Sequence, residues 1–368
     1  MLRLRPSFVE IDTDALEHNV RTVCQRVGPG IKVFVVMKGD AYGLGSVATA
    51  RAARAGGAYG LSTANPDFVS LIREDGNDIP VLIYPASLPP QAAELLSLGI
   101  IPTIHDFESM DGFARLGKAI DVYVKVDCGN TRLGFPPQTA AAAFERLREY
   151  PQLRLAAVYS QFRSQRDPLF VQRQAATFDA ICKIAEQAGF SGFDRMVSPS
   201  DLVLERPQLN YTAVNPGKII YGLVPDAVIR ANGLKPVVTG IRARIIQVRT
   251  VAAGEYDFGA DEPLTVPRRI AVASIGFLDG LNHQKPCHEV LVRGRRAKVL
   301  GLRSMEYTIF DVTSIEGVEV GDEVALLGKQ GDDEITAEEL AGALEMPIIE
   351  LIPKVGRMAT RRYIGVHA

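Results

Sequence analysis

Short apolar runs alternate with amphipathic stretches through the first two thirds of the chain. The stretches at residues 139–150 and 168–188 repeat apolar residues at three- and four-residue spacing, which is typical of helices that bury one face. Strand-like runs that alternate with such helices predict parallel βα units. Eight units within roughly 250 residues predict a closed (β/α)8 barrel with its active site at the carboxyl ends of the strands. The expected strands cover residues 33–37, 58–62, 80–84, 100–104, 122–126, 153–159, 195–198 and 213–221.

The pattern changes after residue 235, where closely spaced β-type runs replace the alternation of strand and helix. We therefore expect two domains, a barrel over residues 1–235 and a β-rich domain over residues 236–368. We expect that roughly the first 12 residues can pack with the second domain. Its expected strands cover residues 241–251, 270–274, 290–292, 297–299, 308–312 and 323–327.

The composition is that of an ordinary globular protein, with 368 residues of which 47% are hydrophobic and 23% charged. The formal net charge of −2 lacks the basic excess of a nucleic-acid or membrane-surface binder, so a small-molecule ligand is expected. The first residues show no apolar signal-peptide core and no run reaches about 18 apolar residues, which favours a cytoplasmic protein without a membrane span. Cys24, Cys128, Cys182 and Cys287 show no CxxC spacing, so free thiols are expected rather than a metal site or disulfides.

Lys38 ends the first strong apolar run, and a small, turn-forming segment follows it as far as Gly43. Burial disfavours an ammonium ion and lowers the pKa of a lysine, which provides the free amine that a Schiff base requires. Tyr42 follows four residues later with a hydroxyl able to reach a phosphate. A carbonyl and a phosphate together indicate pyridoxal 5′-phosphate. The alternative is a strand-end lysine that only extends its ammonium group to solvent.

Polar groups also follow other expected strands. Lys125 and Arg132 flank a turn at residues 127–131 that would aim a guanidinium at a phenolate or a carboxylate. A glycine turn at residues 216–218 follows another strand, and the backbone N–H groups at Gly217 can hold a phosphate. Singly, a glycine turn is often structural and an arginine often forms a surface ion pair. Their occurrence at the strand ends of one barrel favours a common ligand site.

These motifs resemble the alanine racemase family, pyridoxal-phosphate enzymes with an N-terminal barrel and a C-terminal β domain. The resemblance runs through most of the chain and keeps one order. It is carried by residues 8–12 with Ala15, Leu16 and Asn19, by residues 36–43 and 124–134, by Gly217 with residues 221–223, by Gly276 with residues 279–280, and by residues 305–306 and 321–324.

The resemblance implies a role for each matching residue. Lys38 would bind the cofactor as a Schiff base, Arg132 would face its phenolic oxygen, and Lys125, as an amine or as a carbamate, would orient Arg132. The active sites would be shared within a homodimer, and Met305 would lie near the substrate carboxylate of the partner subunit's site. The phosphate would be held by Tyr42, Ser200 and the amides of Gly217 and Lys218.

Several departures from the family pattern fall on chemistry rather than on packing. Phe277 stands where the family has its second base, a tyrosine, and phenylalanine has no proton to give or take. Asn215 stands where an arginine faces the pyridine nitrogen, and Met196 where a histidine supports that arginine. Gln161, Leu44 and Ile349 also stand at positions where the family has other polar residues.

Phe277 leaves two interpretations open. Either the protein still racemises slowly, with water or a group such as His283 as the acid, or the same cofactor complex has another outcome. Loss of the arginine would allow the ring nitrogen to be protonated, which favours decarboxylation, retro-aldol cleavage, elimination or transamination. Arg163 and Lys218 would select a substrate with a second acidic group, unless both are surface residues.

We therefore expect a homodimeric pyridoxal-phosphate enzyme that acts at the α-carbon of an amino acid. An amino-acid racemase, or a diverged relative that lacks the second base, is the first hypothesis. A lyase, decarboxylase or transaminase on the same fold is the second, and a non-catalytic carrier of pyridoxal phosphate is the third. The second domain argues against a carrier, because in the family that domain closes the partner's active site.

Overall fold

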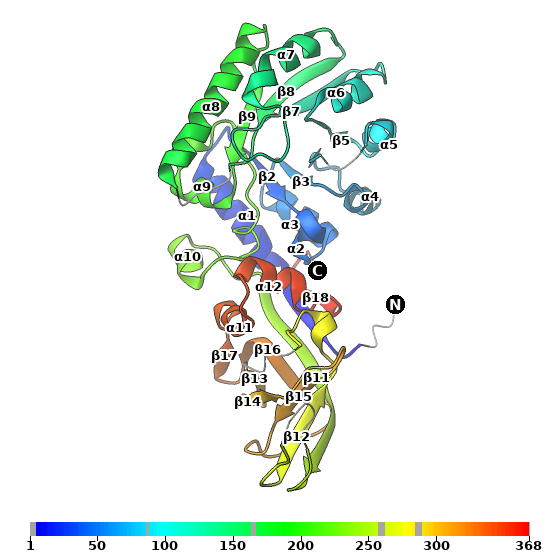
Figure 1. Cartoon of the computed structure of the whole chain (residues 1–368), viewed down its shortest axis with the longest axis vertical. Helices are drawn as coiled ribbons and strands as arrows, with labels where there is room; N and C mark the ends of the chain where they lie inside the picture. Colours follow the sequence, from blue (N-terminus) through cyan, green and yellow to red (C-terminus); the bar gives the residue numbers. More distant parts are fainter. Residues whose placement is uncertain (1–4, 86–87, 163–166, 257–261, 284–288, 368) are drawn as a thin grey trace. The chain divides into compact units, whose positions relative to one another are not determined.

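The chain divides into two units, which Figure 1 shows in a computed structural model that describes residues 5–85, 88–162, 167–256, 262–283 and 289–367. The first, called here the barrel unit, comprises residues 17–41 and 45–220. The second, called the β unit, comprises residues 1–16, 42–44 and 221–368.

The barrel unit contains a parallel sheet of nine strands in the order β5-β4-β3-β2-β10-β9-β8-β7-β6. A strand lies within or overlaps each of the eight expected ranges. The parallel ladder is buried on both sides, as the near-continuous apolar runs require. The strands are β2 (Lys32–Val36), β3 (Gly60–Thr63), β4 (Val81–Ile83), β5 (Ile100–Ile101), β6 (Thr103–Ile104), β7 (Ile120–Lys125), β8 (Leu153–Tyr159), β9 (Asp194–Ser198) and β10 (Ala213–Val214).

Pro102 explains why eight expected strands appear as nine. It separates β5 from β6, which are the two edges of the sheet, and it has no N–H to donate to the ladder. Its carbonyl still accepts a hydrogen bond from the amide of Tyr123 at 3.0 Å. Because β5 and β6 are halves of one interrupted strand, the sheet returns on itself as an eight-stranded barrel.

The last barrel strand is shorter than predicted. Residues 213–221 were expected to be extended, but β10 covers only Ala213–Val214. Pro216 interrupts the ladder, and the amide of Ile220 then donates to the carbonyl of Gly217 at 2.8 Å in a turn. The polar residues after β10 therefore lie in a loop at the carboxyl end of the barrel.

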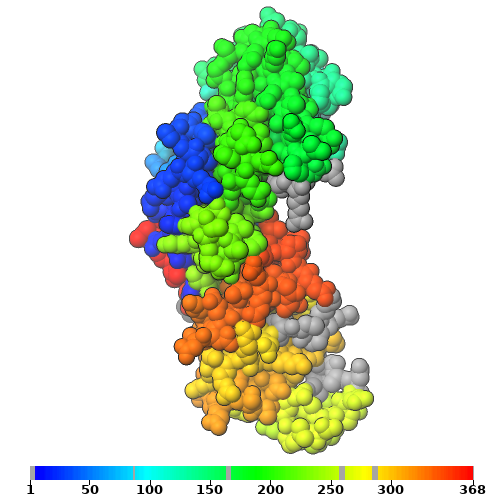
Figure 2. Space-filling model, turned by 90° about the vertical axis from the view of Figure 1, so that its left-hand side faces the viewer, coloured from blue at the N-terminus to red at the C-terminus, as the bar shows by residue number. Residues whose placement is uncertain are grey.

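Helices follow the strands and cover the outside of the barrel, and in Figure 2 the green atoms of the α7 to α9 region form much of the visible surface of this unit. The two expected helices are confirmed as α7 (Pro137–Arg148) and α8 (Pro168–Gln187). Side chains cap several amino termini; Asp106 accepts from the amide of Ser109 at 2.7 Å. The other helices are α1 (Thr13–Val27), α2 (Lys38–Tyr42), α3 (Ser46–Ala55), α4 (Asp67–Glu74), η1 (Pro89–Gln91), α5 (Ala92–Ser97), α6 (Phe107–Ala114), α9 (Ser200–Glu205) and η2 (Pro207–Leu209).

The β unit is built on an antiparallel ring of strands. Strand β16 pairs with both β13 and β11, which closes the order β11-β12-β15-β14-β13-β16. All six strands expected in this part of the chain are confirmed. They are β11 (Val238–Val251), β12 (Arg268–Ala273), β13 (Glu289–Val292), β14 (Arg295–Leu300), β15 (Thr308–Asp311) and β16 (Glu323–Gln330).

Three further strands extend this sheet and were not expected as strands. Strand β1 (Phe8–Asp12) pairs antiparallel with β11 and parallel with β18 (Thr360–Ile364), and β17 (Asp333–Ile335) pairs with β16. The short helical elements of this unit are α10 (Asp226–Ala231), η3 (Phe277–Asp279), α11 (Ala337–Ala343) and α12 (Ile348–Lys354).

Among the described residues, no helix is long and apolar enough to cross a bilayer. Cys24, Cys128 and Cys182 are free thiols, as expected, whereas Cys287 lies outside the described residues.

Candidate active site

Lys38 directly follows β2 at the carboxyl end of the barrel. The amide of Met37 donates to the carbonyl of Ser62 on β3 at 2.8 Å, which fixes the chain at this point. The Lys38 Nζ lies 5.1 Å from the centroid of the Tyr84 ring. The side chain keeps an accessible surface, but the barrel walls remove part of its hydration. This desolvation and the charge of Arg132 lower the pKa of Lys38, which favours the free amine.

A left-handed turn follows Lys38. Residues 39–42 have φ between 55° and 60°, which only glycine adopts at no cost. The three non-glycine residues each cost about 1–2 kcal/mol in this conformation. Asp40 offsets part of that cost, because its Oδ1 accepts from the amide and the hydroxyl of Ser46 at 2.8 and 2.6 Å. The turn leads to Tyr42, whose ring packs 4.9 Å from the ring of Tyr221 in the β unit.

Lys125 ends β7 and is almost fully buried, with 5% of its surface exposed. Its Nζ lies 4.3 Å from the centroid of the Tyr159 ring on β8. Burial, with the charges of Arg132 and Lys38, lowers the pKa of Lys125 to about 7. Near pH 7, Lys125 is therefore a neutral amine in about half of the protein molecules.

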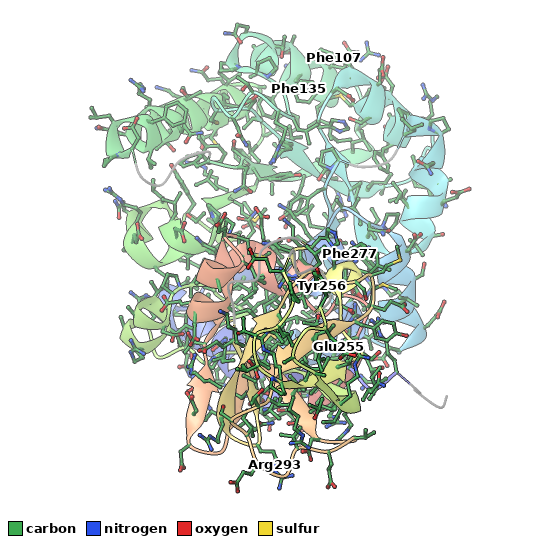
Figure 3. All side chains as sticks on the ribbon, turned by 60° about the horizontal axis from the view of Figure 1, so that its bottom comes forward. Phe107, Phe135, Glu255, Tyr256, Phe277 and Arg293 are labelled. Atoms are coloured by element: carbon green, nitrogen blue, oxygen red, sulfur yellow. The ribbon has the colours of Figure 1, made fainter. Side chains whose placement is uncertain are left out.

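The loop after Lys125 brings Arg132 back toward the end of β7. Asp127 Oδ1 accepts from the amides of residues 129, 130 and 131 at 2.9, 2.7 and 3.1 Å, which folds the loop into a tight turn. The amide of Phe135 then donates to the carbonyl of Lys125 at 3.0 Å. The ring of Phe135 packs edge-on against Phe107 at 5.2 Å and anchors the loop (Figure 3).

Lys38, Lys125 and Arg132 gather three basic groups at one end of the barrel. Within the described part of the chain, none of the three forms a salt bridge with a carboxylate. A cluster of this kind favours an anionic ligand that would neutralise it. The structure thus places together the three residues that sequence reasoning assigned to one ligand.

The turn after β10 supplies further groups. The amide of Gly217 donates to Ser200 Oγ at 2.9 Å, and Ser200 begins α9 directly after β9. The Lys218 ammonium pairs with Asp201 at 2.7 Å, which engages its charge. Ser200 and the amides of this turn are therefore the groups here that suit a phosphate, whereas the side chain of Lys218 is held by Asp201. Arg163, the other cation expected near the substrate, lies outside the described residues.

A buried polar network lies beside Lys38 and was missed by sequence reasoning. Tyr84 Oη donates to Ser62 Oγ at 2.9 Å and accepts from Asn215 Nδ2 at 3.2 Å. Within the described residues, the buried Oδ1 of Asn215 has no hydrogen-bond partner. Burial raises the pKa of Tyr84, so its hydroxyl keeps its proton at neutral pH. The sequence signal was a tyrosine at the carboxyl end of an expected strand, which was counted there as part of an apolar run.

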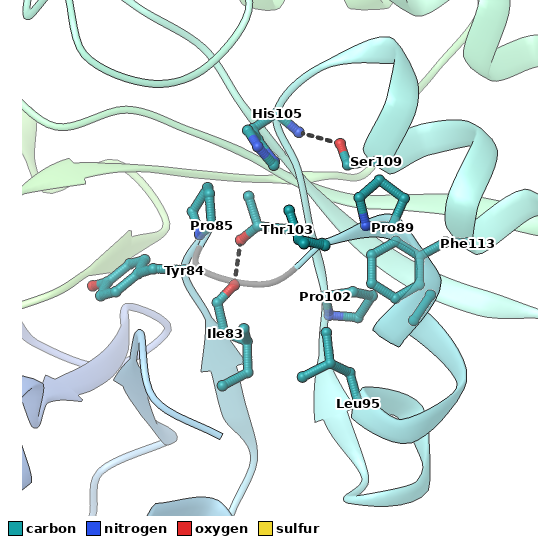
Figure 4. Close-up of a pocket in the computed structure, with 12 residues that line it drawn as sticks. Ile83, Tyr84, Pro85, Pro89, Leu95, Pro102, Thr103, His105, Ser109 and Phe113 are labelled. Atoms are coloured by element: carbon teal, nitrogen blue, oxygen red, sulfur yellow. Dashed lines mark hydrogen bonds between the residues drawn. The ribbon is translucent and has the colours of Figure 1, made fainter. Parts of the chain in front are cut away.

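A second tyrosine completes this polar layer. Thr103 donates to the carbonyl of Ile83 at 2.6 Å, as Figure 4 shows, and its oxygen therefore accepts from Tyr159 Oη at 2.8 Å. Figure 4 also shows the ring of Tyr84 directed away from Phe113. Tyr84 and Tyr159 thus present hydroxyl groups inside the barrel, where apolar strand residues would be the default.

The residues that depart from the family pattern lie in mostly apolar places. Met196 on β9 and Leu44 are fully buried and carry no group for a proton or a phosphate. Gln161 follows β8 and is half-buried, and Ile349 on α12 is exposed in the β unit. These positions add no charge to the site.

Phe277 and Met305 lie side by side in the β unit. The amides of Phe277 and Leu278 donate to the carbonyls of Ser304 and Met305, both at 3.0 Å. Gly276 permits this contact, because a Cβ there would lie 2.4 Å from the carbonyl oxygen of Ser304. Met305 is 55% exposed, as suits a residue that faces a partner or a ligand.

His283 packs against Phe277, with ring centroids 5.3 Å apart and planes at 75°. Its Nδ1 lies 2.7 Å from the carbonyl oxygen of Arg303. A carbonyl only accepts, so Nδ1 carries a proton and Nε2 is the acceptor of the neutral ring. The position expected to hold a second base therefore has a phenyl ring with an imidazole beside it (Figure 3 labels Phe277).

Comparisons with known proteins cover nearly the whole chain. The family model described as "Alanine racemase, N-terminal domain" matches residues 11–225, and "Alanine racemase, C-terminal domain" matches residues 238–363. An alanine racemase of Synechocystis sp. is 34% identical over 359 residues, which cover 94% of this chain and 95% of the relative. The solved alanine racemase from E. faecalis is 27% identical with a TM-score of 0.88 over 98% of both chains. That from Bacillus anthracis with bound L-Ala-P is 25% identical, with a TM-score of 0.90 over 100% of this chain and 97% of the other.

Proposed function

Because the chain belongs to the alanine racemase family, whose members are pyridoxal 5′-phosphate enzymes, we propose that Lys38 alone moves the α-proton of an amino acid such as alanine. The observation that carries this proposal is the desolvated Lys38 amine beside Lys125 and Arg132, while residue 277 is a phenylalanine. The matched relatives reported above are all alanine racemases. They favour racemase-like chemistry over the lyase, decarboxylase, transaminase and carrier alternatives.

The residues around Lys38 fit pyridoxal phosphate. Among the described residues, the three basic groups pair with no carboxylate and Asn215 Oδ1 has no donor; the basic groups suit the phosphate and phenolic oxygen of the cofactor, and Asn215 Oδ1 suits a polar atom of its ring. Lys38 would hold the carbonyl carbon, and Arg132, oriented by Lys125, would face the phenolic oxygen. Ser200, Tyr42 and the amides of Gly217 and Lys218 would hold the phosphate.

When bound, pyridoxal phosphate supplies an electron sink that makes the α-proton of an amino acid acidic. The chain's own residues must then remove and return that proton. Lys38, once its amine is free, accepts the proton at Nζ and returns it from the same side, and its lowered pKa favours the free amine. Phe277 has no ionisable proton, so it can only exclude water from its side of the substrate.

The site is proposed to be completed across a homodimer. The β unit carries Phe277 and Met305 together, and their exposed edge would border the cofactor of the partner subunit. Met305 would contact the amino-acid substrate there. Its exposure in a single chain supports this assignment.

The test compares two rates on one substrate. Alanine is incubated with the holoenzyme in deuterated water, exchange of the α-hydrogen is followed by NMR, and inversion is followed by chiral chromatography. A single base returns the proton to one face, so exchange should exceed inversion by roughly the 10²- to 10⁴-fold that one positioned acid-base group contributes. Inversion that keeps pace with exchange would overturn the single-base proposal, and absence of both reactions would overturn the proposed function.

A further inference from the structure

We propose that Asn215, held by Tyr84 and Ser62, accepts a hydrogen bond from the ring nitrogen of the cofactor and keeps that nitrogen protonated. This inference rests on the proposed function, since it requires pyridoxal phosphate on Lys38. It deepens that function by assigning a positioning role to Tyr84 and Ser62.

The topology of the barrel brings these residues to both sides of Lys38. The sheet order β4-β3-β2-β10 places the strand of Lys38 between β3, which carries Ser62, and β10, which Asn215 follows. Tyr84 follows β4, two strands away from β2, and reaches across to Asn215 with its hydroxyl. The Lys38 Nζ lies 5.1 Å from the same tyrosine ring. The network therefore lies directly beside the cofactor-binding lysine.

The directions of the hydrogen bonds determine what Asn215 offers. A tyrosine hydroxyl has one proton, and Tyr84 donates it to Ser62 Oγ at 2.9 Å. Its lone pair accepts from Asn215 Nδ2 at 3.2 Å. The amide oxygen is then turned away from Tyr84, and no residue in the described ranges donates to it although Asn215 is only 3% exposed. A buried acceptor without a donor calls for an N–H or O–H from a ligand.

The part of the chain that the structure describes does not supply that donor. Met196 pairs with Ala213 across the β9–β10 ladder, two residues before Asn215. Met196 is fully buried, and its side chain has no N–H or O–H. Tyr84 keeps its proton because its hydroxyl is buried, so the amide stays oriented across the neutral pH range. The phenolic oxygen of pyridoxal phosphate is assigned to Arg132, its phosphate to Ser200 and the turn at Gly217, and its carbonyl carbon to Lys38, so the protonated ring nitrogen is the group left to donate to Asn215.

The ring nitrogen can be observed directly by loading the holoenzyme with pyridoxal phosphate labelled with ¹⁵N in the ring. The ¹⁵N resonance separates a protonated from an unprotonated nitrogen, and its pH titration gives the protonation midpoint. We expect a protonated nitrogen at neutral pH in the parent protein. Asn215→Leu should lower the midpoint by about one to two pH units, the amount expected from one hydrogen bond to a charged group.

Three further variants separate positioning from packing. Tyr84→Phe should lower the midpoint less than Asn215→Leu, because the amide remains but loses its orienting partner. Asn215→Asp should hold the proton at least as firmly as the parent, since a carboxylate is a stronger acceptor. Asn210→Leu is the matched control: Asn210 is also 3% exposed with an orphaned amide oxygen, but it precedes β10 at the other end of the strand, so the midpoint should not move.

Each contrary result has a distinct meaning. An unprotonated nitrogen in the parent, as an amide turned the other way would produce, would overturn this inference and leave the proposed function intact. An equal shift in Asn210→Leu and Asn215→Leu would also overturn it. Failure of the parent to hold the cofactor on Lys38, seen as absence of the lysine-bound absorption band, would overturn the proposed function itself.

Discussion

Lys125 and Tyr159 face each other across the β7–β8 ladder, with the Lys125 Nζ 4.3 Å from the centroid of the tyrosine ring. The amine of a buried lysine thus lies over an aromatic face instead of beside a carboxylate. An aromatic face stabilises a cation only weakly compared with full hydration. Together with Arg132 and Lys38, this environment lowers the pKa of Lys125 to about 7.

Lys125 should make the free energy of unfolding depend on pH. Its pKa is about 7 in the folded state, against 10.5 for a hydrated lysine of an unfolded chain, so between these values the unfolded state binds more protons. Stability of the cofactor-free protein should therefore rise with pH across that window, by at most about 1.4 kcal/mol per pH unit. Lys125→Met should flatten the rise in carbonate-free buffer, as measured by urea unfolding at several pH values. Lys329→Met, an exposed lysine of the β unit, is the control that should leave the slope unchanged.

The neutral amine of Lys125 should also react with carbon dioxide. A carbamate at this position would carry a negative charge, which Arg132 and Lys38 favour electrostatically. Protein equilibrated with ¹³C-bicarbonate near pH 8 should show a carbamate carbonyl resonance that Lys125→Met abolishes. A resonance that persists in the variant would assign the modification to another amine and remove the carbamate from the site.

Lys38→Ala should abolish the lysine-bound cofactor. Lys38 is the lysine that follows β2, and the strained turn after it fixes its direction. The parent should show the absorption band of lysine-bound pyridoxal phosphate and retain the label after borohydride reduction, whereas the variant should show neither. Lys218→Ala is a suitable control because its ammonium pairs with Asp201. Reduction that labels a different lysine in Lys38→Ala would contradict the assignment.

The barrel and the position of Lys38 were predictable, because buried parallel strands leave continuous apolar runs and several of these runs are followed by polar residues at the same edge. The bond between Asn215 and Tyr84 was not, since 131 residues separate the two and no local spacing records their contact. Strand β18 was missed for a related reason. Residues 360–364 are largely polar, and they become a strand only because β1 offers a parallel edge. Such tertiary partners override local preference.

Assembly can be tested through Met305, which is proposed to border the partner's site. Met305→Lys should weaken binding of the amino acid to the holoenzyme, seen as a raised concentration for half-maximal spectral change. Met358→Lys, at a residue of similar exposure in the same unit, should not. Light scattering should report a dimer in all three proteins. An active monomer at the assay concentration would exclude a shared site.

Phe277→Tyr should raise the rate of alanine inversion, by up to about 10²- to 10⁴-fold, because it supplies a hydroxyl where the family has its second base. Full recovery is not expected, since Asn215 and Met196 also differ from the family pattern and such effects are not additive.

His283→Gln distinguishes the source of any residual inversion in the parent. The His283 Nε2 is an acceptor beside Phe277, so this variant should lower residual inversion without changing α-hydrogen exchange. Rapid inversion by the parent, unaffected by His283→Gln and by Phe277→Tyr, would show that another group delivers the second proton.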